Sequence, residues 1–207
     1  AKLIQSEVEL IEAEKNSVTL TNGTKLDYDY LIIATGTDIY PGETPGMAEH
    51  EWGKSIHSFY TLDTTLALAE KLRNFKEGRV VLNIVDMPIK CPVAPLEFVM
   101  LAEAYFRKRG IRDRVELVYS TPLSSAFTKP VSAKFLGTML DERHIKVEPD
   151  FYIEHVDPDA RKIVSYDERE LEYDLLVSIP LNKGAEAIAR SGLGDELNYV
   201  PVNKHTF

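Results

Sequence analysis

Cys91 is the residue whose type and position most favour covalent redox chemistry in this chain. It is the only cysteine, it has Lys90 as its neighbour, and it lies in a loop that leads into a predicted helix. The partial positive charge at a helix N-terminus and a nearby ammonium group both favour a thiolate over a thiol. Because the thiolate is the nucleophilic form of cysteine, the pattern predicts a reactive sulfur.

Other interpretations of these side chains stay open. A lone cysteine is often a small buried hydrophobe whose packing involves no chemistry. Glu97 follows six residues after Cys91. A carboxyl group near a thiolate can have a raised pKa suited to proton transfer. An acidic residue in the first turn of a helix also stabilises that helix without any chemical role.

The segment that carries both residues is predicted to form a strand, a loop and a helix between Arg79 and Gly110. The run from Val80 to Val85 is nearly continuous in apolar residues, as in a strand buried on both faces of a parallel sheet. From Pro95 onward the apolar residues recur at helical spacing and end in a basic turn before Gly110. This is the first half of a βαβ unit.

The loop of this unit, DMPIKCPVA, contains no glycine. A dinucleotide-binding crossover needs glycines there so that backbone amides can approach a pyrophosphate. Ligands of open α/β sheets bind at the mouth of such crossovers. The loop therefore favours a reactive sulfur in place of a phosphate cradle.

Composition narrows the classes of partner. The chain has 207 residues, 44% of them hydrophobic, and a net charge of −9 from 24 basic and 33 acidic residues. This balance argues against a nucleic-acid partner. No apolar run is long enough to cross a bilayer, and the first fifteen residues lack the apolar core of a secretory signal. One cysteine excludes an intrachain disulfide, and five scattered histidines lack ligand spacing, so we expect no metal site.

The N-terminal part is predicted to be a small antiparallel meander that returns into a buried strand. Alternating residues from Val8 to Tyr28 are interrupted by a tight turn at Asn22-Gly23. YLIIA, residues 30–34, then indicates a buried strand that ends in Thr35-Gly36. Such an ending leaves backbone free of side-chain bulk, which suits the close approach of a ligand.

The rest of the chain alternates between predicted helices and strands. We expect a linker over 38–58, helices over 63–74 (with Asp63 as a possible cap) and 132–143, and strands within 115–119, 145–156, 162–173, 174–180 and 197–202. YDYLIIATG and YDLLVSIP are similar, and each returns the chain to a sheet. This similarity predicts that residues 46–178 form an inserted doubly wound α/β domain and that the two ends belong to another domain.

At the family level, NGTKLDYDYLIIATGT followed by PGETPG resembles a segment of the pyridine nucleotide-disulfide oxidoreductase flavoproteins. In that superfamily the segment closes the FAD-binding domain and leads into a second Rossmann-like domain. IKCPVAPLE, DLLVSIP and ARSGLGD further resemble the sulfide:quinone oxidoreductases and the flavoprotein subunit of flavocytochrome c sulfide dehydrogenases.

The resemblance implies an α/β fold, namely the Rossmann-like second domain of a two-dinucleotide-binding-domain flavoprotein with part of the FAD domain. Residues 1–45 would be the end of the first FAD segment, 46–178 an NAD-binding-like domain with the cysteine loop, and 179–207 the start of the return to the FAD domain. It places Ala34, Thr35, Gly36 and the backbone of Val8 beside FAD, and it makes Cys91 and Glu97 catalytic.

The implied activity is the oxidation of sulfide through Cys91 and a later cysteine, with electrons passing through FAD to quinone or to a cytochrome c. The family's first glycine-rich motif and its late Gly-Asp motif do not occur here. The resemblance therefore implies an internal, separately inactive piece of a longer protein. That protein would be peripherally membrane-associated through parts missing here, and homo-oligomerisation is possible.

Two alternatives stay open, one of them enzymatic and the other from a different functional class. One is a nicotinamide-dependent flavoprotein of the same superfamily, such as a type II NADH dehydrogenase or a coenzyme A disulfide reductase. It requires a glycine-rich loop after the strand that ends near Val85, and the observed loop opposes it. The other is a non-catalytic Rossmann-like binding domain with a structural cysteine.

Overall fold

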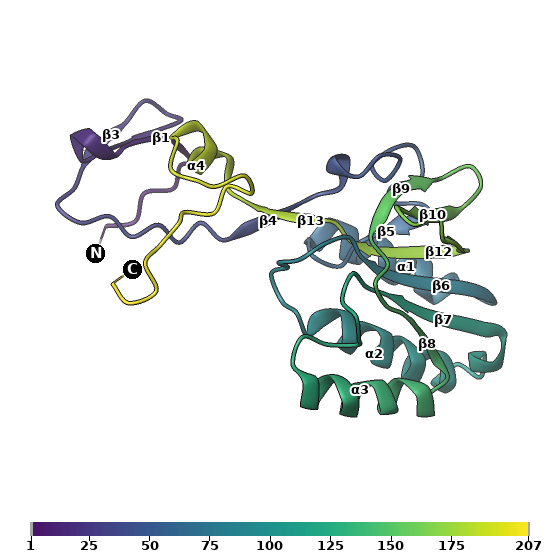
Figure 1. Cartoon of the computed structure of the whole chain (residues 1–207). Helices are drawn as coiled ribbons and strands as arrows, with labels where there is room; N and C mark the ends of the chain where they lie inside the picture. Colours follow the sequence, from purple (N-terminus) through teal and green to yellow (C-terminus); the bar gives the residue numbers. More distant parts are fainter. Residues whose placement is uncertain (1, 207) are drawn as a thin grey trace. The chain divides into compact units, whose positions relative to one another are not determined.

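The computed structural model describes residues 2–206, which fall into two compact units. Unit 1 combines the two ends of the chain, up to Asp38 and from Asn182 onward, and unit 2 is Ile39–Leu181. The strands (Figure 1) are β1 (Val8–Glu12), β2 (Ser17–Leu20), β3 (Lys25–Asp27), β4 (Thr37–Tyr40), β5 (Ile56–His57), β6 (Gly78–Ile84), β7 (Val115–Ser120), β8 (Ile145–Glu148), β9 (Ile153–Asp157), β10 (Lys162–Ser165), β11 (Glu170–Glu172), β12 (Leu175–Ile179) and β13 (Leu181–Gly184). The helices are α1 (Leu62–Asn74), α2 (Ala94–Lys108), α3 (Pro130–Glu142) and α4 (Glu186–Arg190).

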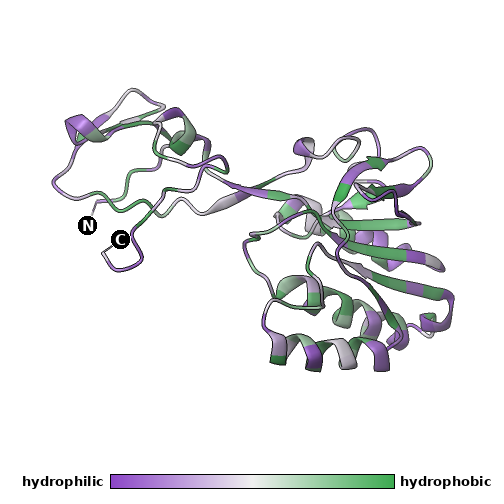
Figure 2. Ribbon diagram, viewed as in Figure 1, coloured by the Kyte–Doolittle hydropathy of each residue, from purple (hydrophilic) through white to green (hydrophobic). Residues whose placement is uncertain are grey.

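Unit 2 is built on a five-stranded parallel sheet with the order β5-β12-β6-β7-β8. The register places Val81 opposite Leu176 on one side and opposite Val118 on the other. The predicted α/β, Rossmann-like class is confirmed by this sheet and its crossover helices. Figure 2 shows that the sheet strands are largely apolar.

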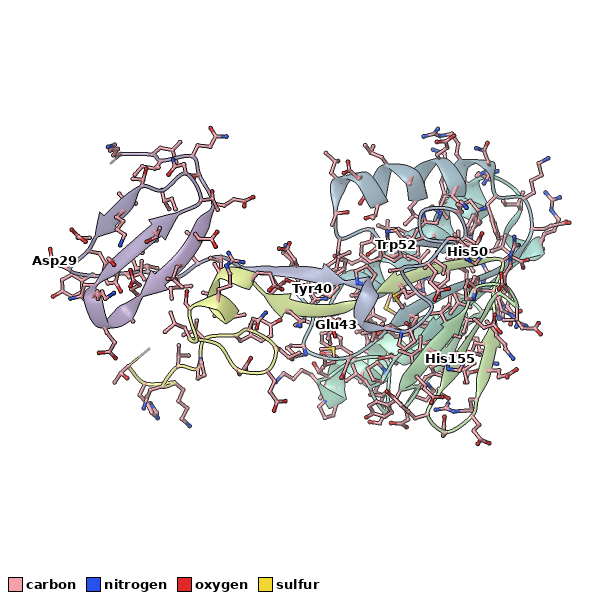
Figure 3. All side chains as sticks on the ribbon, turned by 90° about the horizontal axis from the view of Figure 1, so that it is seen from above. Asp29, Tyr40, Glu43, His50, Trp52 and His155 are labelled. Carbon is pink, nitrogen blue, oxygen red and sulfur yellow. The ribbon has the colours of Figure 1, made fainter. Side chains whose placement is uncertain are left out.

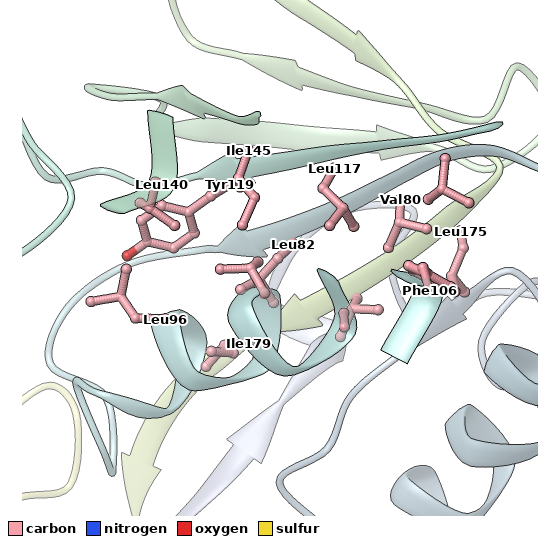
Figure 4. Close-up of a cluster of buried hydrophobic side chains, with 14 of the residues drawn as sticks. Val80, Leu82, Leu96, Phe106, Leu117, Tyr119, Leu140, Ile145, Leu175 and Ile179 are labelled. Carbon is pink, nitrogen blue, oxygen red and sulfur yellow. The ribbon is translucent and has the colours of Figure 1, made fainter. Parts of the chain in front are cut away.

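The prediction that β6 is buried on both faces is confirmed. Val80 and Leu82 point to the face covered by α1, α2 and α3, where they join Leu96 and Phe106 of α2 (Figure 4). Val81 points to the opposite face. This strict alternation follows from the two-residue period of a strand.

The second face of the sheet differs from a doubly wound fold. It is covered by the antiparallel sheet β11-β10-β9 and not by helices. Phe151 and Ile163 pack there against Val81. The segment between β8 and β12 consists of short strands separated by turns, so it lacks a helix long enough to cover this face.

The loop between β4 and β5, which carries His50 and Trp52 (Figure 3), packs against this antiparallel sheet. The amide of Val156 donates to the carbonyl of Pro45 at 2.9 Å. Gly46 has φ +78°, and a Cβ there would lie 1.9 Å from the Val156 carbonyl oxygen. Only glycine fits this close approach of two backbones.

Local signals set the helix ends within one or two residues of the prediction. Thr61, not Asp63, caps α1, and its Oγ1 accepts a hydrogen bond from the Thr64 amide at 3.4 Å. A cap lies just before the helix, whereas Asp63 is already inside its first turn. The Arg109 guanidinium after α2 donates to the carbonyl of Leu72 at 2.7 Å and so ties the end of α2 to the end of α1.

Unit 1 contains the predicted antiparallel meander β1-β2-β3, with Gly23 at φ +82° in the tight turn. Its small core joins Ile11, Val18 and Leu20 to Ile188 of α4, a helix that the sequence analysis missed. β4 and β13 form a separate two-stranded sheet. The core of unit 1 thus needs both ends of the chain.

Two predicted strands of unit 1 are wrong. Residues 30–34 and 197–202 form no strand. Tyr30 and Ile32 are 94% and 88% exposed, although the apolar run predicted burial. A strand needs a hydrogen-bonded neighbour, and within residues 2–206 none pairs with either stretch.

Among the helices of residues 2–206, none has the length and apolarity needed to span a bilayer.

His57 is a buried titratable group on edge strand β5. It is 2% exposed, its Nε2 donates to the Lys54 carbonyl at 3.1 Å, and its Nδ1 has no hydrogen-bond partner within the described chain. Burial lowers the pKa of His57 below 6.5, and the positive charge of Lys71 acts in the same direction. The folded protein therefore holds this imidazole neutral.

We predict that Phe106→Ala lowers the free energy of unfolding by about 3–5 kcal/mol, because it leaves a cavity in the core between α2 and the sheet. Leu101→Ala on the same helix is the control, since Leu101 is 70% exposed and its truncation changes stability by about 0.5 kcal/mol or less. Urea denaturation measures both. Equal losses in the two variants would contradict this assignment of the core.

We also predict that stability falls as the pH drops below about 6.5, the pKa of an unfolded histidine. Below that pH the unfolded chain protonates His57, while the folded state with its lowered pKa does not, so protons favour unfolding. Urea titrations at pH 7.5 and pH 5.5 measure the loss. In His57→Gln the loss between these two pH values becomes smaller, and an unchanged loss would show that His57 is not its source.

Candidate functional site

Three loops of unit 2, one of which carries Cys91, lie at the carboxyl edge of the parallel sheet. β5, β6 and β7 run in the same direction through the sheet, so the loops that follow them leave from the same edge. These loops cover residues 58–61, 85–93 and 121–129. Ligands of open α/β sheets bind at such an edge.

Cys91 lies in the loop after β6, three residues before α2 begins at Ala94, and its side chain is exposed. Packing in a hydrophobic core therefore does not account for this cysteine. Its carbonyl oxygen accepts hydrogen bonds from the Ala94 amide at 3.3 Å and from the Tyr60 hydroxyl at 3.1 Å. The backbone of Cys91 is thus fixed while its sulfur stays accessible.

Glu97 lies in the first turn of α2, and its side chain is exposed. Its amide donates to the carbonyl of Val93 at 3.1 Å. No side chain caps the N-terminus of α2, so an acidic group in the first turn offsets the partial positive charge of the free amides. Both interpretations of Glu97, proton transfer and helix stabilisation, remain predictions.

Aromatic side chains, which the sequence analysis did not identify as part of the site, lie beside the cysteine loop. Phe59 stacks on Phe98 of α2 with ring centroids 5.0 Å apart, and Phe59 contacts Tyr60 at 5.3 Å. Burial raises the pKa of Tyr60 to about 12. The available signal was an aromatic pair directly before the cap of a helix, which is too common in sequences to indicate a site.

A row of buried polar residues crosses the sheet at its carboxyl edge. Ser178, Asn83 and Ser120 lie opposite one another on β12, β6 and β7. The Ser178 hydroxyl donates to Asn83 Oδ1 at 3.3 Å, and Asn83 Nδ2 donates to the Ser120 hydroxyl at 3.4 Å. A polar residue at or near the C-terminal end of each of these three strands was visible in the sequence but was not interpreted.

The FAD-contact residues predicted from the resemblance lie in unit 1. Ala34, Thr35 and Gly36 are exposed and directly precede β4. Gly36 has φ +69°, and a Cβ there would meet no atom within 4 Å, so open space adjoins this backbone. Val8 begins β1, opposite Leu20. The structure thus keeps the 34–36 backbone free, as contact with a ligand requires.

Arg190 and Ser191, at the end of α4, form hydrogen bonds with the backbone of β1. The Arg190 guanidinium donates to the carbonyls of Val8 at 3.2 Å and Glu9 at 3.0 Å. The Ser191 hydroxyl accepts a hydrogen bond from the Ile11 amide at 2.8 Å. These residues belong to the ARSGLGD motif, whose structural role in unit 1 was not predicted.

No protein-family model matches the chain, but individual known proteins are similar to it. Mouse mitochondrial sulfide:quinone oxidoreductase is 28% identical over 209 residues, which cover 98% of this chain and 46% of that protein. An Arabidopsis thaliana alternative NAD(P)H-ubiquinone oxidoreductase is 29% identical over 112 residues, or 52% of this chain and 20% of that protein.

The crystal structure of the sulfide:quinone oxidoreductase from Aquifex aeolicus shares the fold. It superimposes with a TM-score of 0.78 at 24% identity, covering 93% of this chain and 46% of that one. The chain spans about half the length of the curated relatives it matches. Over nearly all of its own length, the chain is therefore similar in sequence to sulfide:quinone oxidoreductases and shares the fold of one of them.

Proposed function

We propose that this chain is part of an FAD-dependent oxidoreductase that oxidises sulfide through Cys91 and passes the electrons to quinone. The observation that carries the proposal is the exposed Cys91 in a glycine-free crossover loop, in a chain homologous to sulfide:quinone oxidoreductases. A sulfur that is exposed on a fixed backbone is accessible to a small sulfur nucleophile when it is part of a disulfide.

The reaction of Cys91 requires a second sulfur, because the chain has no other cysteine. In the proposed step, hydrosulfide attacks the disulfide between Cys91 and a further cysteine of the protein. One S–S bond forms and one breaks, leaving a persulfide on one cysteine and a thiolate on the other. Bound FAD supplies the acceptor for the two electrons that leave the sulfur centre. Quinone, or alternatively a cytochrome c, is the final acceptor.

In unit 1, residues 34–36 fit the proposed FAD contact. Their backbone is exposed, and the positive φ of Gly36 turns the chain without side-chain bulk. The edge of β1 at Val8, held by Arg190, offers a second backbone contact. Glu97 is proposed as the residue that moves a proton at Cys91.

We further infer that unit 1 is only part of an FAD-binding domain. Ile33 packs into the small core of unit 1, while its neighbour Ile32 is 88% exposed. Tyr30 and Leu31 are also exposed. A run of exposed apolar side chains like this one suits coverage by an additional part of the protein, such as a strand.

A nicotinamide-dependent reductase is the second candidate, favoured by the likeness to the Arabidopsis protein over half of the chain. The loop over residues 85–93 opposes it, because it has no glycine where a pyrophosphate must approach the backbone. A non-catalytic binding domain is the third reading. The exposed position of Cys91 disfavours it.

The decisive experiment is an anaerobic sulfide titration of a flavin-loaded protein that contains this chain, beside its Cys91→Ser variant. We predict that sulfide bleaches the flavin and produces a long-wavelength charge-transfer band, and that the variant loses both. The reason is that the proposed disulfide cannot form without Cys91, which is the only cysteine that this chain can contribute to it. Bleaching by NADH but not by sulfide would establish the nicotinamide reading, and no bleaching by either would favour a binding domain.

We predict that Ile32→Lys leaves the stability of this chain within about 0.5 kcal/mol, because the side chain is exposed. In a flavin-loaded protein that contains the chain, the same change lowers FAD retention, since an additional strand would bury an unpaired charge. Thr24→Lys in the exposed hairpin turn is the control for added charge. Flavin absorbance after gel filtration measures retention, and equal retention in both variants would refute coverage of this face.

A further inference from the structure

Two crossover loops of the parallel sheet meet at one hydrogen bond. Tyr60, in the loop between β5 and α1, donates its hydroxyl proton to the carbonyl of Cys91 at 3.1 Å. Cys91 belongs to the loop between β6 and α2. β12 separates β5 from β6 in the sheet, so this contact bridges two strands that are not neighbours.

Tyr60 is itself held on two sides. Its ring contacts Phe59, which stacks on Phe98 of α2 with an angle of 5° between the rings. Thr61, the next residue, caps α1 through the Thr64 amide. A tyrosine whose two sequence neighbours are held by an aromatic stack and by a helix cap has less freedom to lose when its hydroxyl binds a carbonyl.

The contact constrains Cys91 without covering its sulfur. The Cys91 carbonyl accepts from both the Tyr60 hydroxyl and the Ala94 amide, and these two bonds fix the peptide plane after residue 91. That plane fixes the position of the Cys91 Cα and limits the directions that its Cα–Cβ bond can take, while the side chain stays exposed. Displacements of about 1 Å can change rates by up to about 100-fold when reacting groups must be aligned.

Tyr60 keeps its proton throughout the physiological pH range. Burial is the main cause that raises its pKa to about 12, and the negative charge of a Cys91 thiolate acts in the same direction. The hydroxyl therefore remains a hydrogen-bond donor and is unsuited to proton transfer at neutral pH.

We propose that Tyr60 is a positioning residue of the cysteine site: its hydroxyl holds the Cys91 carbonyl and thereby limits the directions in which the sulfur is presented. This inference rests on the proposed role of Cys91 in sulfide oxidation. Neither the sequence motifs nor the comparisons assign a role to Tyr60, which acts through the backbone and touches no reacting atom.

The test compares Tyr60→Phe, which removes only the hydroxyl, with Tyr199→Phe. Tyr199 donates to the Asn182 carbonyl at 3.2 Å, so the control loses an equivalent bond in the rest of the chain. In this chain, hydrogen exchange at the amides of residues 90, 91, 93 and 94 is expected to accelerate in Tyr60→Phe and not in Tyr199→Phe. Unchanged exchange in Tyr60→Phe would overturn the proposal.

The second measurement separates positioning from a merely structural bond. In the flavin-loaded protein, Tyr60→Phe is expected to lower kcat for sulfide oxidation by about tenfold with KM for sulfide nearly unchanged. Faster exchange with an unchanged kcat would show a structural bond only and overturn the proposal. If the wild-type protein does not oxidise sulfide at all, the proposed function and the catalytic consequence of the contact both fail, whereas the exchange result still decides whether Tyr60 holds the loop.

Discussion

The pairing of β12 between β5 and β6 is the constraint on which the rest of unit 2 depends. Leu176 lies opposite Ile56 of β5 and Val81 of β6. β5 and β6 have no direct hydrogen bonds to each other in this sheet order. A strand from late in the unit therefore joins two early strands and fixes the spacing of the loops that follow them. The meeting of Tyr60 with Cys91 depends on that spacing.

The register of this sheet is protected by its polar row. Asn83 shares hydrogen bonds with Ser120 and Ser178, all on the face away from the helices. A slip of one residue would turn the asparagine into the apolar core beneath α2 and leave its amide unpaired there. Buried polar groups that are satisfied in only one register disfavour the alternatives. The row thus specifies the alignment that places the loops at the carboxyl edge.

Prediction from the sequence succeeded where one short segment carries its own physical signal. The apolar run of β6, the helical spacing of α2 and the Asn-Gly turn each follow from local periodicity or backbone preference. Cys91 was singled out by its neighbours in the loop. Residues 30–34 were assigned as a buried strand because apolar runs are usually paired, but pairing depends on a partner that local sequence does not reveal. The Tyr60 contact was missed for the same reason, since it joins residues 31 positions apart.

The insertion of unit 2 between the two parts of unit 1 has a consequence for biosynthesis. The core of unit 1 joins Ile11 and Val18 to Ile188, so it cannot form until the ribosome has made α4. At 5–20 residues per second, translation of the intervening unit takes on the order of 10 s. During that time the first meander waits with its apolar side chains uncovered, while unit 2 can fold as soon as β12 emerges. The meander β1-β2-β3 is therefore among the last parts of the chain to reach its native packing.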